Sequence, residues 1–497
     1  MRKQVFFNED PNHFVFERIR AGKTDVTRDD IISFIRQYKN TGVTDFLICL
    51  NGSSCWYPSR RTDNVIDKFN RLGDKGDKIT WGAAMMAQIY GNGLSIHKMW
   101  IDELRACGIR PWLSIRMNDI HGSAHPEDFL NSEMVDNHPE YRRTPHRKAV
   151  GYTDFALDYM REGVREYYMT VIEEALETFD ADGIEFDFMR EIYSLCIGRE
   201  YEGTEVINDF LRRAHAKVKE AEVKRGHEIK INVRVPSNPE LAMRLGFDVF
   251  AWVEEGIVDY LTVCPRWASS DNNMPIDIWK KIFGGKVQVL AGIESLLDAY
   301  NRRPRVYRHN TLETDIGSAC AYLGMGADGM YLFNHMDSVS PHEDHPECAI
   351  INSGMETLLR VAGDYEALQN SHRRHVVTFC DVSAVGAGVP KQLPVTIGNN
   401  IFPALRVPTG KIPKGALVRL TVGVSGEVNE NELFAFANAK PCGKAYKTEW
   451  QYPQYDDISY YSFEIENDGA LPPVTVFEIS MTEGKATVHW AEIEVKA

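Results

Sequence analysis

Residues 161–190, REGVREYYMTVIEEALETFDADGIEFDFMR, join a long segment with helical periodicity to a short strand. Apolar side chains recur at helical spacing over residues 161–179, and polar and apolar side chains alternate over residues 183–189. A helix that leads directly into a buried strand is the repeating unit of a β/α protein. The same arrangement recurs on both sides of this stretch.

Eight strands of this kind are predicted, at residues 5–8, 45–51, 110–118, 183–189, 230–235, 260–265, 287–294 and 329–335. Helices are predicted between them at residues 29–38, 95–107, 161–179, 204–225 and 312–323. Eight β/α units in series favour a closed (β/α)8 TIM barrel, in the α/β class, over an open sheet. No G-x-G-x-x-G follows the first strand and no G-x-x-x-x-G-K-[ST] occurs, which argues against a nucleotide-binding fold.

After about residue 373 the helical periodicity gives way to short strand-like runs with glycine and proline between them, at residues 375–379, 392–397, 417–422, 460–465, 474–481 and 486–495. This pattern predicts a C-terminal antiparallel β-sandwich. We therefore expect two domains, a barrel over residues 1–372 and a sandwich over residues 373–497. Because no exposed aromatic platform can be recognised in the second domain, we expect it to pack on the barrel rather than to bind carbohydrate.

The composition limits the classes of function. The 497 residues contain 56 Lys and Arg against 71 Asp and Glu, a net charge of -15, which disfavours binding to nucleic acid. The 9 cysteines are scattered without a C-x-x-C pair, so neither a disulfide framework nor a zinc ribbon is indicated. No apolar run is long enough to span a membrane or to form a signal peptide. We expect a cytoplasmic protein with a small substrate; the sequence leaves open whether it forms a homo-oligomer.

Acidic side chains mark the inside of the predicted barrel. On the fourth strand, alternation turns Ile184 and Phe186 toward the helices, and Glu185 and Asp187 into the barrel. Burial and a neighbouring like charge raise the pKa of such a group, which is how a carboxyl group becomes a general acid near neutral pH. The same alternation on the seventh strand brings Glu294 to the opposite side of the barrel mouth.

Two carboxyl groups on opposite sides of one site are what cleavage of a glycosidic bond requires. The sequence therefore predicts a glycoside hydrolase acting on a short oligosaccharide or glycoside, without a metal or other cofactor. We expect Asp187 to be the general acid, Glu294 the nucleophile or base, and Glu185 an auxiliary carboxylate, although Glu185 is equally well explained as an ion-pair partner of a lumen arginine. Polar and aromatic residues at strand ends and on the long connections 52–93 and 119–159 are predicted to bind substrate: Arg116, Asn118, Asn232, Arg234, Arg266, Asn334, His335 and Trp56.

A family resemblance supports this interpretation. The successive stretches 155–158 (FALD), 163–167 (GVREY) and 182–190 (DGIEFDFMR) resemble a run in glycosyl-hydrolase-like barrel families. In those families a Leu-Asp/Asn-Pro and Pro-Glu-Val-Arg segment precedes a fourth strand that begins Asp-Gly-Ile-His and continues to an Asp. The resemblance implies that Asp187 is an active-site acid. This chain has Glu185 where the family usually has His, and it lacks the Pro of the second element.

Two other functions fit the same residues. Glu185, Asp187 and Glu294 are also suitable oxygen ligands for the metal ion of a lyase or isomerase. The chain is also compatible with a carbohydrate-binding protein without catalytic activity, in which the acids serve only as hydrogen-bond acceptors. The arginines predicted inside the barrel suit either an anionic sugar or the neutralisation of these acids.

Overall fold

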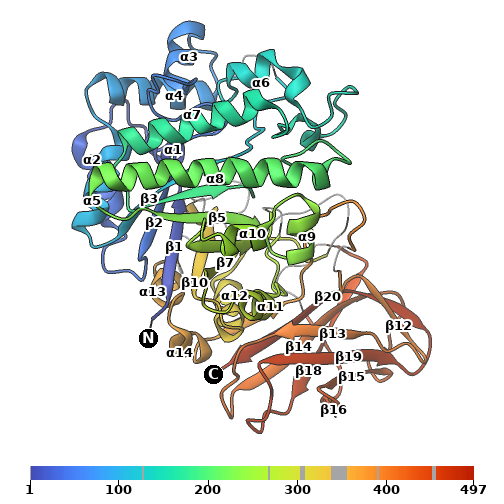
Figure 1. The fold of residues 1–497 in the computed structure, drawn as a ribbon. Coiled ribbons are helices and arrows are strands. Elements are labelled where there is room, and N and C mark those ends of the chain that lie inside the picture. The colour runs from blue at the N-terminus through green and yellow to red at the C-terminus, as the bar shows by residue number, and fades with distance from the viewer. Residues whose placement is uncertain are drawn as a thin grey trace.

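The computed structural model describes residues 2–125, 128–266, 269–300, 302, 308–336, 355–388, 391–449 and 455–497. Eight parallel strands close into a barrel in the order β1-β10-β7-β6-β5-β4-β3-β2 (Figure 1). Their bounds are β1 (Gln4–Glu9), β2 (Asp45–Cys49), β3 (Arg110–Arg116), β4 (Gly183–Asp187), β5 (Lys230–Pro236), β6 (Tyr260–Cys264), β7 (Gln288–Glu294) and β10 (Gly329–Phe333). All eight strands overlap the predicted ones, four of which were predicted two residues too long at their carboxyl ends, and the predicted TIM barrel is confirmed.

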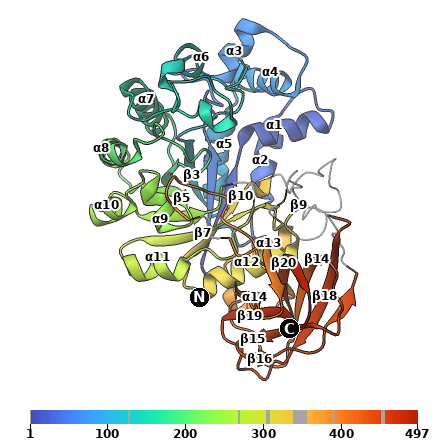
Figure 2. The ribbon, with the colours of Figure 1, turned by 90° about the vertical axis from the view of Figure 1, so that its right-hand side faces the viewer.

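Helices surround the barrel (Figure 2). They are α1 (Pro11–Arg20), α2 (Arg28–Arg36), α3 (Val65–Leu72), α4 (Lys78–Gly91), α5 (Ile96–Ala106), α6 (Glu133–Asn137), α7 (Glu162–Thr178), α8 (Glu200–Arg225), α9 (Pro239–Arg244), α10 (Val249–Glu254), α11 (Ile276–Phe283), α12 (Leu312–Gly324), α13 (Met355–Val361) and α14 (Tyr365–Gln369). The five predicted helices are confirmed as α2, α5, α7, α8 and α12. The long connection 52–93 contains α3 and α4, whose first turns are capped by the side chains of Asn64 and Asp77. None of the described helices is long and apolar enough to cross a membrane.

Strand alternation divides the side chains as predicted. Ile184 and Phe186 join the large apolar core between strands and helices, whereas a separate interior cluster contains Phe6, Leu47, Trp112, Tyr260, Leu290, Tyr331 and Phe333. Gly183 has no side chain because the ring of Trp112 fills that space: a Cβ there would lie 2.2 Å from the ring. Aromatic side chains therefore fill much of the barrel interior.

The C-terminal residues form an antiparallel sandwich, as predicted. One sheet has the order β11-β20-β14-β18-β17 with β12 paired to β20, and the other has the order β13-β19-β15-β16. The strands are β11 (Arg373–Val376), β12 (Val395–Gly398), β13 (Ala404–Pro408), β14 (Leu417–Ser425), β15 (Leu433–Ala437), β16 (Lys440–Pro441), β17 (Tyr446–Thr448), β18 (Ile458–Ile465), β19 (Val474–Met481) and β20 (Lys485–Lys496). The strands β13 and β15, of five residues each, were not predicted.

The sandwich packs against the connection that follows β7. Tyr300 from this connection shares a buried apolar cluster with Tyr460 and Trp490 of the sandwich. Two short strands, β8 (Leu296–Leu297) and β9 (Arg308–His309), pair within the same connection. The contact agrees with the expectation that the second domain packs on the barrel, and it brings the segment after β11 close to the carboxyl ends of the barrel strands.

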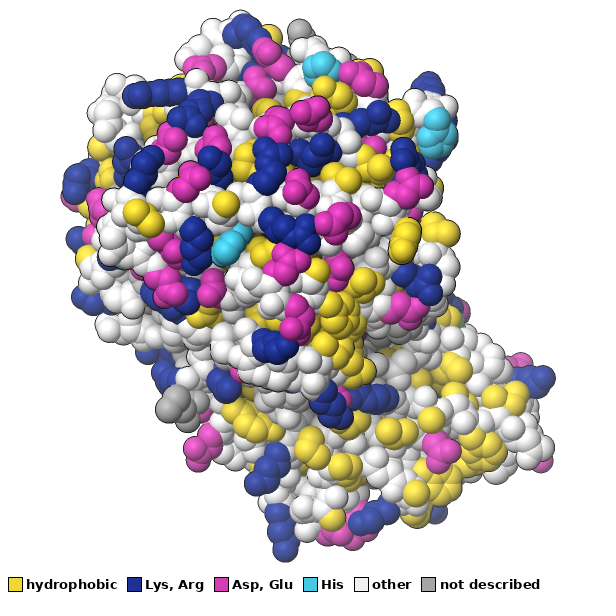
Figure 3. Space-filling model, in the orientation of Figure 1, with side chains coloured by type: hydrophobic (Ala, Val, Ile, Leu, Met, Phe, Trp, Pro, Cys, Tyr) yellow, Lys and Arg dark blue, Asp and Glu magenta, His cyan; other side chains and the backbone are white. Residues whose placement is uncertain are grey.

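The outer face over α7 and α8 carries interspersed charges of both signs (Figure 3). Arg213 on α8 pairs with Glu166 on α7 at 2.8 Å, and Lys217 pairs with Glu173 at 3.2 Å. Exposed pairs of this kind contribute little to stability, typically below about 1 kcal/mol each. The charged part of α8 is therefore a solvated surface that belongs to the outside of the barrel.

Candidate active site at the carboxyl ends of the barrel strands

Asp187 ends β4 and points into the barrel, where three donors hold its carboxyl group. Arg234 Nη1 on β5 lies 2.9 Å from Oδ2. The backbone N–H groups of Met189 and Arg190 donate to Oδ1 at 2.7 and 3.1 Å. A guanidinium ion and two backbone donors all stabilise the charged carboxylate. These contacts suit a nucleophile or base better than a proton donor.

Glu294 ends β7, which β5 and β6 separate from β4. Its carboxyl group accepts hydrogen bonds from the Ser295 N–H at 3.1 Å and from Asn334 Nδ2 at 3.1 Å. The donors to Glu294 among the described residues are all neutral. Burial raises the pKa of Glu294 well above its ordinary value, and the Asn334 amide and the charge of Arg234 oppose this shift only in part. The environment of Glu294 therefore favours a protonated carboxyl group, which is what a general acid needs.

Asn334 owes its position to an unusual backbone conformation. Its φ is 57°, in the left-handed region that few residues other than Gly and Asn adopt readily. This conformation comes directly after β10 and turns the amide toward Glu294. Strain of this kind tends to be kept where it positions a functional group.

Arg234 acts on both carboxyl groups. Its side chain is fully buried, its Nε lies 3.2 Å from Cys264 Sγ, and its guanidinium stacks 3.4 Å from the centre of the Phe333 ring. It pairs directly with Asp187, and its charge also acts on Glu294. Burial raises the pKa of the Cys264 thiol to about 12, which makes this cysteine an inert packing group.

Glu185 lies one pleat deeper and is saturated with neutral donors. Its Oε1 accepts from Ser114 Oγ at 2.7 Å and Tyr331 OH at 2.9 Å, and its Oε2 accepts from Asn232 Nδ2 at 2.7 Å. Burial, followed by the charge of Asp187, raises the pKa of Glu185 to about 7. The ion pair with a lumen arginine that we considered from the sequence is not formed, because Arg116 and Arg234 pair with other acids.

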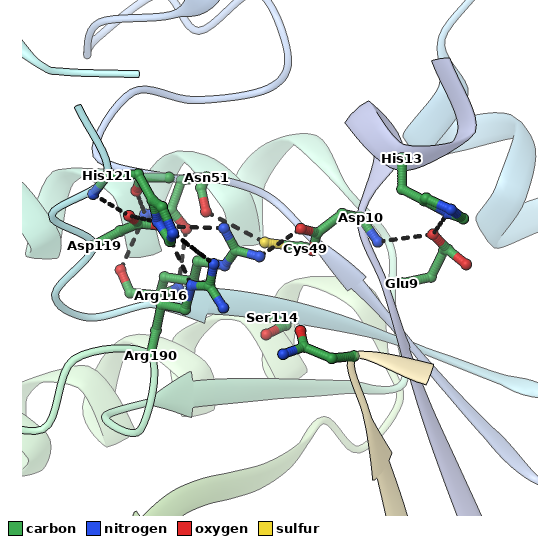
Figure 4. A network of polar contacts seen from close by, with 12 residues as sticks. Glu9, Asp10, His13, Cys49, Asn51, Ser114, Arg116, Asp119, His121 and Arg190 are labelled. Carbon is green, nitrogen blue, oxygen red and sulfur yellow. Dashed lines mark hydrogen bonds and ion pairs between the residues drawn. The ribbon is translucent and has the colours of Figure 1, made fainter. Parts of the chain in front are cut away.

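A second charged network lies beside the first, around Arg116 at the end of β3 (Figure 4). Arg116 bridges Asp10 and Asp119, with Nη1 2.9 Å from Asp119 Oδ2. Asp119 also bonds His121 Nδ1 at 2.7 Å, and Arg190 Nη2 lies 3.0 Å from Nε2 of the same ring. Burial raises the pKa of Asp119, but His121 and the charges of Arg116 and Arg190 hold it well below its ordinary value.

The rim of the site continues through Glu191 and Arg266. Glu191 Oε2 accepts from Arg266 Nη2 at 2.7 Å, and burial raises the pKa of Glu191 although Arg266 opposes this. The backbone N–H of Arg266 donates to Asp381 Oδ1 at 2.8 Å. Asp381 lies between β11 and β12, so the chain that leads into the sandwich supplies a carboxylate to the rim of the barrel.

The predicted substrate-binding residues fall into two groups. Arg234 and Asn334 contact the two carboxyl groups, Arg116 is the register partner of Asp187 on β3, and Arg266 pairs with Glu191 at the rim. Four others are engaged elsewhere: Asn118 binds the backbone of Leu157 and Tyr193, Asn232 holds Glu185 and Thr262, His335 bonds Phe333 O and Asp315 on α12, and Trp56 packs in the outer core. These contacts leave His335 and Asn118 as structural residues.

Sequence reasoning missed Asp10, Asp119, Arg190, Glu191 and Asp381. Asp10, Asp119, Arg190 and Glu191 have a common signal in the sequence. Each follows the end of a barrel strand within four residues, which is where a barrel places functional groups. Asp381 had no such signal, since it belongs to a connection within the second domain. Among the described residues, no group of three or more His, Cys, Asp or Glu side chains is arranged to hold a metal ion.

The sequence matches no protein-family model and no curated protein. Solved structures with a similar course of the chain include alpha-L-fucosidase isoenzyme 1 from Paenibacillus thiaminolyticus (14% identity, 96% of each chain, TM-score 0.35). A family GH18 chitinase from Chromobacterium violaceum has 9% identity over 98% of this chain and 90% of its own, with a TM-score of 0.38. The glycoside hydrolase domain of PgaB from Bordetella bronchiseptica has 9% identity over 71% and 99%, with a TM-score of 0.40. These likenesses are distant in sequence and in shape, so the functional argument rests on the side chains.

Proposed function

We propose that this protein is a glycoside hydrolase that uses Asp187 and Glu294 as its pair of catalytic carboxyl groups. The observation that carries the proposal is the contrast between their surroundings. Asp187 is held by a guanidinium ion and two backbone donors, whereas Glu294 has neutral donors and a raised pKa. Two acids in contrasting environments can serve as the acid and the base of one reaction.

The contacts favour a division of roles opposite to the one expected from the sequence. Glu294, kept protonated by burial, donates its proton to the oxygen of the departing group. Asp187, held by Arg234 and two backbone N–H groups, attacks the anomeric carbon or activates a water molecule. Glu185 is assigned a supporting role, because Ser114, Tyr331 and Asn232 already occupy its oxygens.

The charges around the site favour a neutral sugar. Arg116, Arg234 and Arg266 each pair with at least one carboxylate of the protein. An anionic sugar would have to compete with these buried partners, and separating a buried ion pair costs about 3–5 kcal/mol. The arginines are therefore best explained as neutralising the acids, which was one of the two explanations left open by the sequence.

A panel of aryl glycosides tests the proposal with the wild type, Asp187→Asn and Glu294→Gln. A matched control is Asp182→Asn: Asp182 precedes β4 at the other end of the barrel and pairs with Arg105 at 2.7 Å. We expect hydrolysis of at least one glycoside by the wild type and the control, and a loss of 100-fold or more, on the order of the usual contribution of acid-base groups, in both site variants. Equal activity in all four proteins would refute the assignment.

The two alternative functions give different results in the same assays. A metal-assisted lyase or isomerase would lose activity on treatment with a chelator, whereas the proposed hydrolase keeps it. A carbohydrate-binding protein without catalytic activity would bind sugars but release no phenol from any aryl glycoside.

A further inference from the structure

Asn8, near the end of β1, is a buried carboxamide without a hydrogen-bond partner among the described residues. Only 3% of the residue is exposed, and its Oδ1 is buried without a hydrogen bond. Within the described part of the chain, no hydrogen bond involves either atom of this amide. Its direction follows from alternation, since Gln4 bonds Tyr260 inside the barrel and Phe6 belongs to the interior cluster. Asn8 therefore points into the lumen.

The surroundings of Asn8 make an unpartnered amide costly. Phe6 lies two residues before Asn8 on the same strand, and Leu47 on β2 is the register partner of Asn8. Both Phe6 and Leu47 belong to the apolar interior cluster. A valine or leucine would fit such a layer without any loss of hydrogen bonding. Buried polar groups without partners are rare in folded proteins, and one that persists calls for a ligand or a bound water molecule.

Two further polar atoms at this end of the barrel are also unpartnered. Asp10, two residues beyond Asn8, uses Oδ2 to bind Arg116 and leaves Oδ1 buried without a bond. Arg234 uses Nη1 to bind Asp187 and leaves Nη2 buried without a bond. Each side chain is thus fixed by one contact while a second polar atom has no hydrogen-bond partner among the described residues. Fixed groups bind a ligand without a further loss of side-chain entropy.

The atoms without hydrogen-bond partners include both acceptors and donors. Asp10 Oδ1 and Asn8 Oδ1 accept hydrogen bonds, and Asn8 Nδ2 and Arg234 Nη2 donate them. Hydroxyl groups do both, so a ring with several neighbouring hydroxyls can satisfy the whole set. Asp10 would repel an anion and Arg234 would repel a cation.

We propose that Asn8 and Asp10, with Arg234 Nη2, form a binding subsite for the hydroxyl groups of a neutral sugar ring. The subsite deepens the proposed function, on which it rests for the choice of ligand. It places part of the substrate against β1. In the barrel, β1 is the neighbour of β10, and β10 is the neighbour of β7, which ends with Glu294. It also explains why the chain keeps a polar residue where an apolar one would pack.

The variant Asn8→Val tests the subsite, because a binding role and a structural role predict opposite changes in stability. We expect Asn8→Val to melt at the same temperature as the wild type or higher, since no protein hydrogen bond is lost and an amide no longer has to be desolvated. The matched control is Asn118→Val, which removes three hydrogen bonds and should lower the melting temperature. A melting temperature of Asn8→Val as low as that of the control would overturn the proposal.

Ligand binding is measured with D-glucose, D-galactose, D-mannose, L-fucose and D-xylose, by calorimetry and by the shift in melting temperature. We expect at least one of these sugars to bind the wild type, and Asn8→Val to bind it about tenfold more weakly. Unchanged affinity in the variant, or binding of none of the five sugars, would overturn the subsite even if glycosides are hydrolysed. Sugar binding that Asn8→Val weakens, without any hydrolysis, would support the subsite and refute the proposed hydrolase.

Discussion

Replacing Glu185 by Gln should remove a pH dependence from the stability of the barrel. The folded protein raises the pKa of this group from 4.5 to about 7, so Glu185 binds a proton more tightly in the folded state than in the unfolded chain. Stability from this source is fully present below pH 4.5 and is lost as the pH rises through about 7. At about 1.4 kcal/mol per pKa unit, the loss is about 3 kcal/mol.

Glutamine fits the same hydrogen bonds. Its carbonyl oxygen can accept from Asn232, and its NH2 group can donate to Ser114 and Tyr331, because hydroxyl groups accept as well as donate. Urea unfolding of wild type and Glu185→Gln between pH 4 and pH 9 provides the assay. We expect the variant to be more stable than the wild type by about 3 kcal/mol above pH 8, and to show no such gain at pH 4. A variant that is less stable than the wild type at pH 8 would refute the assigned protonation of Glu185.

Three further substitutions test separate parts of the account. Arg234→Met should lower the free energy of unfolding by about 3–5 kcal/mol in urea titrations at pH 7, because it leaves Asp187 buried without its ion partner; a loss below 1 kcal/mol would contradict the structure. Gly183→Ala should cost about 1–3 kcal/mol, since its Cβ would meet the ring of Trp112 at 2.2 Å, and an unchanged melting temperature would show that the ring can move away. His335→Phe should lower stability by about 1–3 kcal/mol because Asp315 loses its partner. Its KM for a hydrolysed glycoside should stay at the wild-type value, and a large rise would mean that His335 does contact the substrate.

The barrel was predictable from sequence because its strands are short and buried and each is followed by a long connection. Alternation along β4 also gave the direction of Glu185 and Asp187 correctly, since every second residue of a strand faces the same side. The same reasoning fails just past the strand ends. Asn118 and His335 lie there, and their side chains are taken up by contacts with Leu157 and Asp315.

The protonation of the site depends on contacts that a sequence does not contain. Asp187 and Glu294 both end barrel strands, and they differ in their donors, which are Arg234 and two backbone N–H groups for Asp187 and mainly the Asn334 amide for Glu294. The contribution of Asp381 depends on how the second domain packs on the barrel. Asn8 is a polar residue in an apolar layer, and only the structure shows that its amide oxygen is buried without a hydrogen-bond partner among the described residues.

The roles of the two carboxyl groups are tested most directly by the dependence of the rate on the leaving group. Hydrolysis rates of aryl glycosides with phenols of increasing pKa would be compared for the wild type, Asp187→Asn and Glu294→Gln. We expect Glu294→Gln to be about 100-fold or more slower with poorly departing phenols and nearly as fast as the wild type with dinitrophenol, which needs no proton. Asp187→Asn should be slow with every substrate. The reverse pattern, with Asp187→Asn rescued by good leaving groups and Glu294→Gln slow throughout, would contradict the account.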